Sequence, residues 1–208
     1  MRRSTWPARV SVLLAVVLAM TVCAAAEKKR ESRDTWQQPD RVVKDLGLKP
    51  GSIIADVGCG RGYFTFRLAK AVGAAGKVFA EDVDLKALKS IEDRIAKDRL
   101  ENLVVVKGDG ADTKLESESL DAALMVDVFH HVPEQARLGL ARDVLRALKP
   151  GGYFFLVHWA FDANVSYRRI TRDDLLKLAA DAGLKLDAEF LYLDRQVFFR
   201  FRKPTAPK

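Results

Sequence analysis

Cysteine is scarce in this sequence: its 208 residues contain only Cys23 and Cys59. Cys23 lies in an N-terminal segment that we expect to be removed, which would leave Cys59 alone. One cysteine cannot form an intramolecular disulfide, and it cannot supply a cysteine-rich metal site. We therefore expect the fold to depend on a hydrophobic core, and the length of the chain suits a single domain.

Apolar runs of membrane-spanning length are missing, since a helix needs about 20 residues to cross a bilayer. The apolar run Val10–Val22 has 13 residues; three arginines precede it and Ala24-Ala25-Ala26 follows it. This pattern predicts a signal peptide at residues 1–26 and an exported protein, periplasmic or extracellular, with no stable membrane insertion after cleavage. The alternative is an uncleaved segment that anchors the chain in a membrane.

Long blocks of like charge are also missing. Without the first 26 residues the chain has 32 basic and 28 acidic residues, a net charge of +4. This mild excess, with no basic and aromatic stripe, gives no reason to expect a nucleic-acid partner. We expect a linker or N-terminal cap at residues 27–38, one domain at 39–202 and a tail at 203–208. The sequence does not indicate an oligomeric state.

Strand and helix patterns alternate through the domain. Strands are expected at 52–57, 77–82, 103–107, 120–126 and 153–158, with helices at 39–46, 64–72, 84–97, 134–148 and 171–182, and a hairpin at 186–193 and 196–202. This order predicts an α/β fold: a Rossmann-like, doubly wound, mainly parallel seven-stranded sheet with a C-terminal antiparallel hairpin. Ligands in such sheets bind beyond the carboxyl ends of the strands.

A glycine-rich turn, Asp56-Val57-Gly58-Cys59-Gly60-Arg61-Gly62, joins the first expected strand to a helix. It lacks the Gly-Lys-Ser/Thr of a P-loop, and its glycine spacing misses the dinucleotide fingerprint GxGxxG by one residue. A tight turn that holds no ligand is the plain alternative. Asp56 disfavours a pyrophosphate and would suit a ligand with a cationic amino group.

Two further acidic residues follow neighbouring strands. Asp82 ends the second strand, where a carboxylate can accept hydrogen bonds from both hydroxyls of a ribose. Asp109 and Gly110 follow the third strand, where Asp109 suits an adenine amino group, although an Asp-Gly turn explains this pair equally well. The three acids together favour an adenosine that carries a cationic tail.

The motifs DVGCGRGYF, VFAEDVD, KGDGAD, LDAALMVD and LKPGGYFFLV resemble those of class I S-adenosylmethionine (SAM)-dependent methyltransferases. The resemblance covers about residues 39–202 and implies SAM as the cofactor. It implies that cofactor-binding residues are Asp56, Gly58, Cys59, Gly60, Asp82, Val83, Asp109, Gly110 and Asp127. The segment Trp36–Pro39 either closes over the cofactor or simply caps the fold on its solvent side.

Histidines are few, and all three follow or end expected strands. His131, or else His130, is the candidate for taking a proton from an acceptor hydroxyl or amine, with a helix-capping or buried structural role as the alternative. Asp127 lies where metal-dependent relatives carry a carboxylate, but the Asp-Asn pair they also need is replaced by His158-Trp159, so no metal is expected. Aromatic and basic residues after the fifth strand, Trp159, Phe161, Tyr167, Arg168 and Arg169, either wall an acceptor pocket or cover the last helix.

The leading hypothesis is therefore an enzyme that transfers a methyl group from SAM to a small molecule. Two other classes stay open. An exported module that binds SAM or a nucleoside without catalysis is supported by the signal pattern, because SAM is made in the cytoplasm. An NAD-dependent oxidoreductase is disfavoured by the glycine spacing and by Asp56.

Overall fold

The computed structural model describes residues 32–159 and 170–205. It divides into two units, residues 1–35 and residues 36–208. The predicted signal peptide and four of the predicted acceptor-wall residues, Phe161, Tyr167, Arg168 and Arg169, lie outside the described residues. Among the residues described, no helix is both long enough and apolar enough to cross a membrane.

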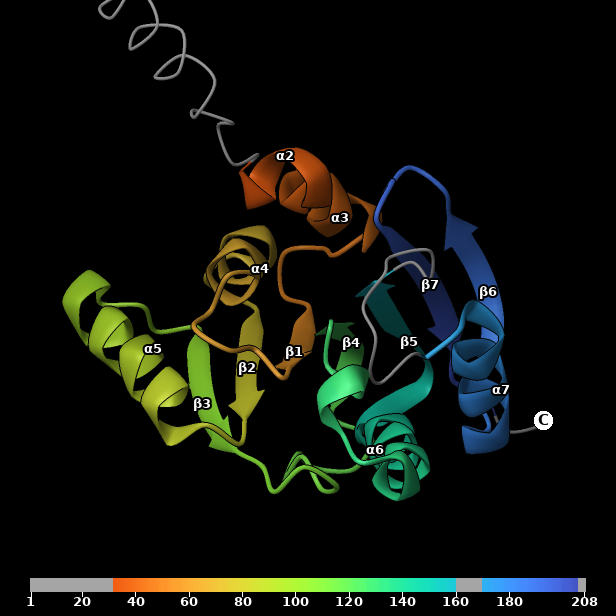
Figure 1. The fold of residues 1–208 in the computed structure, drawn as a ribbon. Helices are drawn as coiled ribbons and strands as arrows, with labels where there is room; N and C mark the ends of the chain where they lie inside the picture. Colours follow the sequence, from red (N-terminus) through yellow and green to blue (C-terminus); the bar gives the residue numbers. More distant parts are fainter. Residues whose placement is uncertain (1–31, 160–169, 206–208) are drawn as a thin grey trace, which may run out of the picture. The chain divides into compact units, whose positions relative to one another are not determined.

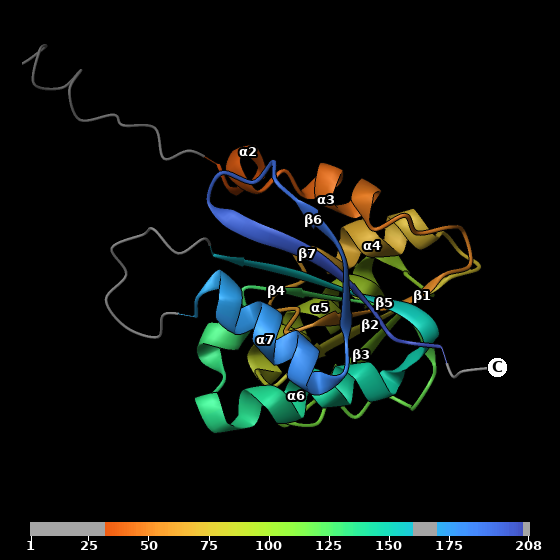
Figure 2. The ribbon, with the colours of Figure 1, turned by 90° about the vertical axis from the view of Figure 1, so that its right-hand side faces the viewer.

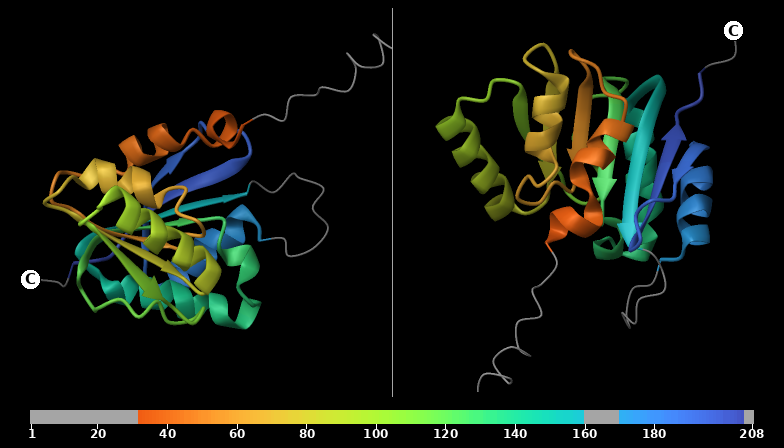
Figure 3. Two further views of the ribbon diagram at one scale, coloured as in Figure 1. Left: turned by 90° about the vertical axis from the view of Figure 1, so that its left-hand side faces the viewer. Right: turned by 90° about the horizontal axis from the view of Figure 1, so that it is seen from above.

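Seven strands form one sheet in the order β3-β2-β1-β4-β5-β7-β6 (Figure 1). Their bounds are β1 Ile53–Val57, β2 Lys77–Asp82, β3 Leu103–Lys107, β4 Leu120–Val126, β5 Leu148–Trp159, β6 Lys185–Phe190 and β7 Gln196–Arg202. The first five pair in parallel, and β7 pairs antiparallel with both β5 and β6. In Figure 3 the arrow of β7 opposes that of β5. The expected mainly parallel sheet with a C-terminal hairpin is confirmed.

Helices lie on both faces of this sheet (Figure 2). The α-helices are α2 Arg33–Gln37, α3 Pro39–Asp45, α4 Thr65–Val72, α5 Leu85–Asp98, α6 Glu134–Ala147 and α7 Arg172–Ala182, and a 3-10 turn, η1, spans Phe129–His131. Helices α3 and α4 pack on one face, and α6 and α7 on the other. The central strands β1 and β4 are buried on both sides, which explains their continuous apolar runs.

Alternate residues of β1 show how the sheet separates the two layers. Ile54 packs in the cluster with α3 and α4, whereas Ala55 and Val57 pack in the cluster with α6 and α7. Successive side chains of a strand point to opposite faces, so Asp56 is directed toward the α4 layer. The end of β1 therefore places this carboxylate next to the helix that follows the glycine loop.

Helix boundaries follow local sequence signals. Asp84 caps α5 by accepting a hydrogen bond from the backbone of Lys86. At α7, Thr171 and Asp174 form a capping box, and Gly183 ends the helix in the left-handed region at φ +96°. These side chains satisfy N–H groups that a helix leaves without an internal partner.

Strand β5 begins earlier than the sequence pattern indicates. The segment Lys149–Gly152, which separates the expected helix from the expected strand, lies within β5. Gly151 donates to Lys203 O at 3.0 Å, and Lys203 donates to Gly152 O at 2.9 Å. Pairing with the chain after β7 thus extends the strand through residues whose local preference is a turn. The expected linker also contains a short helix, α2.

Candidate functional site

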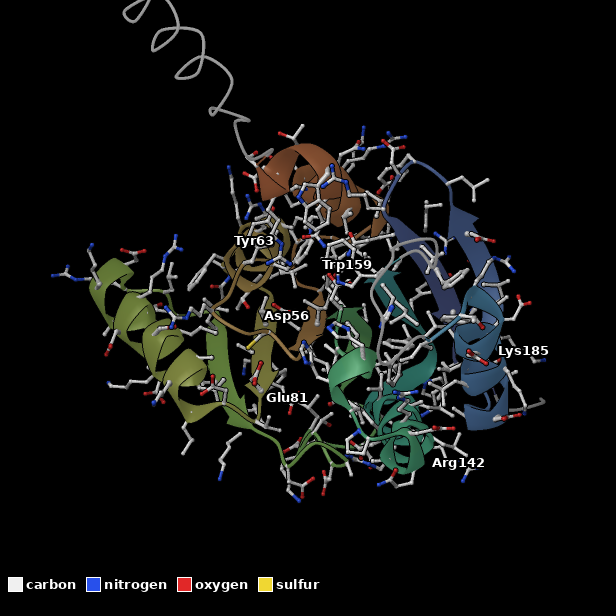
Figure 4. All side chains as sticks on the ribbon, in the orientation of Figure 1. Asp56, Tyr63, Glu81, Arg142, Trp159 and Lys185 are labelled. Carbon is white, nitrogen blue, oxygen red and sulfur yellow. The ribbon has the colours of Figure 1, made fainter. Side chains whose placement is uncertain are left out.

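The carboxyl ends of β1, β2 and β4 bring most of the predicted site residues together. Val57 at the end of β1 is in register with Glu81 of β2 and with Met125 of β4. The glycine loop begins beyond Val57, and Asp56 and Glu81 lie on the two neighbouring strands (Figure 4). The site is therefore built at the central strands of the sheet.

The three glycines of the loop have different neighbours, although each has a positive φ. A Cβ added to Gly58 would collide with the side chain of Val128, and one added to Gly62 would collide with the ring of Phe66. A Cβ added to Gly60 would meet no described atom within 4 Å. Gly58 and Gly62 thus allow close packing within the protein, while Gly60 leaves its backbone open to a ligand.

Asp56 fixes the start of helix α4. Its Oδ2 accepts a hydrogen bond from the Thr65 hydroxyl at 2.6 Å, and both residues are buried. Thr65 is the first residue of α4. This bond joins the residue before the glycine loop to the first residue of the helix after it. Asp56 therefore holds the two ends of the loop together and adds negative charge beside it.

Asp82 is tied to the same loop from β2. Its Oδ2 accepts from the backbone N–H of Gly60 at 2.8 Å, and its Oδ1 accepts from that of Asp84 at 2.9 Å. A carboxylate has about four acceptor positions, so two bonds to backbone leave capacity for further donors. The carboxylate is half-buried and held in one orientation, as a group that recognises a diol requires.

Val83 and Gly110 face each other beside Asp82. The side chain of Val83 is 53% exposed, and its Cγ1 would lie 3.9 Å from a Cβ placed on Gly110. Nothing else described lies within 4 Å of that Cβ. An exposed apolar side chain opposite a glycine leaves room for a planar ring, such as a nucleobase, to pack between them.

Asp109 takes part in a turn of its own. Its Oδ1 accepts from the backbone N–H groups of Ala111 and Asp112, and its Oδ2 lies 3.1 Å from Lys114 Nζ. These hydrogen bonds and the lysine charge lower the pKa of Asp109. The Asp-Gly turn that the sequence left open is thus present. A contact with adenine stays a prediction.

Cys59 contributes backbone to the loop but directs its side chain elsewhere. Its N–H donates to Glu81 O at 2.9 Å, while the thiol is buried in a cluster with Ala80, Leu88 and Ile91. Burial, followed by the charge of Asp56, raises the pKa of this thiol. The residue is therefore a small core side chain, and only its main chain faces the site.

Glu81 precedes Asp82 in β2 and faces the opposite side of the sheet. It is 4% exposed, and its Oε2 accepts from the backbone N–H of Gly58 at 3.3 Å. Burial raises its pKa to about 8, although the Gly58 hydrogen bond opposes this shift. A carboxyl group that is largely protonated at neutral pH thus supports the loop from the α6 side of the sheet.

Asp127 follows β4 in the left-handed region, with φ +57°. Its N–H donates to Val157 O at 2.9 Å, and its Oδ2 accepts from Gln196 Nε2 at 2.8 Å. Gln196 in turn accepts from Gln37 Nε2 at 3.0 Å. The sequence argument missed Gln37 and Gln196, because no local pattern links positions 159 residues apart.

The three histidines form one cluster. The ring centroids of His130 and His131 are 3.9 Å apart, and those of His130 and His158 are 5.3 Å apart. Burial, with the nearby His130 as a second cause, lowers the pKa of His158 to about 4. His158 is therefore neutral at pH 7, whereas His131 is exposed at the end of η1.

Two tryptophans meet near the end of β5. The rings of Trp36 and Trp159 stack with centroids 5.0 Å apart, and the Arg195 guanidinium lies 5.7 Å from the Trp36 ring. Trp159, labelled in Figure 4, is 39% exposed. This contact anchors Trp36 at the carboxyl edge of the sheet, and closure of Trp36–Pro39 over the cofactor stays a prediction.

Comparison with known proteins agrees with this architecture. Residues 54–152 match the family model of a methyltransferase domain. A demethylmenaquinone methyltransferase of Staphylococcus aureus (strain JH9) is 34% identical over 122 residues, which are 59% of this chain and 48% of that protein. The chain thus spans about half the length of the curated relatives it matches.

Solved structures show the same fold. A SAM-dependent methyltransferase from Aquifex aeolicus has a TM-score of 0.74 at 24% identity, covering 85% of this chain and 96% of that one. The [4+2]-cyclase SpnF has a TM-score of 0.71 at 18% identity, covering 86% of each chain. These structures confirm the expected Rossmann-like fold, and the family match places a methyltransferase domain at residues 54–152.

The residues present fit SAM, the cofactor of that family. Open space over Gly60 admits a ligand to the loop backbone, and Asp82 keeps acceptor capacity for ribose hydroxyls. Val83 and Gly110 would flank the adenine ring. Asp127 would place negative charge near the cationic amino group at the neighbouring strand end.

Proposed function

We propose that this protein is a SAM-dependent methyltransferase that acts on a small-molecule acceptor. The observation that carries the proposal is the pairing of Asp82 with Gly60, which places an oriented carboxylate beside an open stretch of loop backbone. The family match and the methyltransferase relatives support the same reaction.

SAM supplies a methyl group on a positively charged sulfur, which is already activated toward a nucleophile. The main task of the protein is then to hold the acceptor in line and to exclude water, which can be worth about 7–11 kcal/mol. The fixed carboxylates and loop backbone serve this task. His131, or else His130, would take the acceptor proton, whereas neutral His158 adds no positive charge beside them.

The acceptor we favour is a planar, weakly acidic ring such as a quinol or phenol. The stacked pair Trp36 and Trp159, with Arg195 nearby, provides aromatic surface and positive charge at the same edge. The relatives named for demethylmenaquinone methylation support this class. Aromatic faces bind planar rings by offset stacking, which suits such an acceptor.

Binding and turnover test the proposal separately. Calorimetry should find micromolar binding of SAM and of S-adenosylhomocysteine, and no binding of NADH. Labelled SAM should then methylate a member of a panel of quinols, phenols, amines and thiols. Binding of NADH without SAM would contradict the proposal.

A second candidate, a SAM-binding protein with another activity or none, has one specific observation in its favour. A neighbour of this fold is named a [4+2]-cyclase and not a methyltransferase. Intact SAM binding with no methyl transfer to any of the four acceptor classes would favour this candidate.

We also propose that the protein is exported after cleavage between Ala26 and Glu27. The support is the arrangement of arginines, apolar run and small residues in the sequence. N-terminal sequencing of the protein from fractionated cells should find Glu27 first. Finding Met1 on soluble cytoplasmic protein would contradict export.

A further inference from the structure

Three polar side chains from distant parts of the chain are hydrogen-bonded in series. Gln37 at the end of α2 donates to Gln196 at the start of β7, and Gln196 donates to Asp127 after β4, at 3.0 and 2.8 Å. Gln37 is 0% exposed and Gln196 is 3% exposed. Buried amides of this kind are costly unless their partners are well placed, so the series constrains all three segments.

The direction of the series is set by the Asp127 carboxylate, and Gln37 has to match it. An amide has one donating and one accepting end, while a carboxylate only accepts. Because Gln37 Nε2 donates to Gln196 Oε1, the Nε2 of Gln196 is directed at Asp127. The opposite orientation of the Gln196 amide would set its oxygen against Asp127 Oδ2. By donating to the Gln196 oxygen, Gln37 therefore supports the orientation that Asp127 needs.

The series ends at the turn that packs on the glycine loop. Asp127 has a left-handed backbone, and Val128, the next residue, fills the space that Gly58 leaves by lacking a Cβ. At the other end, Trp36 precedes Gln37 and stacks on Trp159. Trp36–Gln37 thus makes two contacts with the carboxyl edge of the sheet: the tryptophan stack and the hydrogen bond to Gln196. The second contact continues to Asp127, a predicted cofactor-binding carboxylate.

We propose that Gln37 and Gln196 are positioning residues that orient the Asp127 carboxylate for the cationic amino group of SAM. Packing of Trp36–Gln37 against the sheet edge and binding of the cofactor are then coupled through these two amides. The inference rests on the proposed function, since it requires that this site bind SAM.

Two substitutions of Gln37 separate the orientation of the Gln196 amide from packing. Gln37→Met removes the donor but leaves Gln196 free to keep its bond to Asp127. Gln37→Glu, when ionised, turns the donor into an acceptor, so the Gln196 amide must reverse and present its oxygen to Asp127. Gln135→Glu makes the same chemical change at an exposed position of α6 and is the control.

S-adenosylhomocysteine, which keeps the amino group, is titrated into each variant from pH 5.5 to 8.5. We expect Gln37→Glu to bind about tenfold more weakly than Gln37→Met at the upper pH. The two should converge at the lower pH, where the introduced carboxyl is protonated and donates.

Three outcomes are decisive. Equal affinity of the two Gln37 variants at every pH, with normal binding by the wild type, would overturn the inference alone. No binding by the wild type would overturn the proposed function as well. Hydrogen exchange on the wild type avoids any folding defect: S-adenosylhomocysteine should slow exchange at the backbone amides of residues 36–38, and unchanged exchange would overturn the coupling.

Discussion

The Asp82 carboxylate holds the backbone N–H of Gly60 at 2.8 Å, so the end of β2 is fastened to the middle of the loop that follows β1. The two residues lie 22 positions apart in the sequence, and the pairing of β1 with β2 brings them together. One contact thus sets both the shape of the loop and the direction of the carboxylate that we assign to the ribose.

Removing this carboxylate should weaken cofactor binding. We expect Asp82→Ala to lose about 10- to 100-fold in SAM affinity, because hydrogen bonds to a charged acceptor contribute about 1.5–3 kcal/mol. Asp84→Ala is the matched control: it removes the cap that accepts from Lys86 and should lower stability by about 1 kcal/mol with little change in affinity. Calorimetry and urea unfolding measure the two effects, and equal affinity losses would contradict the assignment.

Gly60 should differ from other glycines in its effect on binding. Gly60 has φ +54° and Gly47 has φ +64°, and neither would bring a Cβ within 4 Å of a described atom. Alanine at either position should cost about 1–2 kcal/mol of stability because of the left-handed backbone. Only Gly60→Ala should also weaken SAM binding, by tenfold or more. If Gly47→Ala weakened binding as much, the loss would reflect stability and not a ligand at Gly60.

The succession of strands along the chain and the cofactor loop were predictable, because both depend on local patterns. Buried parallel strands give continuous apolar runs, and the turn after β1 concentrates glycines that its positive φ angles require. The carboxyl ends of parallel strands then meet at one edge whatever the side chains are. Asp56, Asp82 and Asp127 were expected there and lie there.

The remaining features depend on pairing that the local sequence does not encode. Gly151 and Gly152 favour a turn by themselves, but the chain after β7 hydrogen-bonds with them and extends β5. The bond from Gln37 to Gln196 joins residues 159 positions apart. At Asp109 a local pattern is present but ambiguous, because one Asp-Gly pair suits a turn and an adenine contact equally well.

The raised pKa of Glu81 predicts a loss of stability at alkaline pH. Its pKa rises from 4.5 to about 8 on folding, so between these values the folded chain keeps a proton that the unfolded chain has lost. Stability therefore falls as pH rises through this window, by about 5 kcal/mol in full. Glu81→Gln keeps an acceptor for Gly58 and should remove this fall. Urea unfolding at pH 5 and 9 tests it, and parallel curves for wild type and variant would refute the shift.

The lowered pKa of His158 predicts the opposite dependence on the acid side. Its pKa falls from 6.5 to about 4 on folding, because burial disfavours the imidazolium. Between these values the unfolded chain binds a proton that the folded chain does not, so stability falls as pH drops from 6.5 toward 4, by about 2–3 kcal/mol. His158→Gln should lose less stability between pH 7 and 4.5 than the wild type. Urea unfolding at pH 7 and at pH 4.5 measures this difference, and an acid loss in His158→Gln as large as that of the wild type would contradict the lowered pKa.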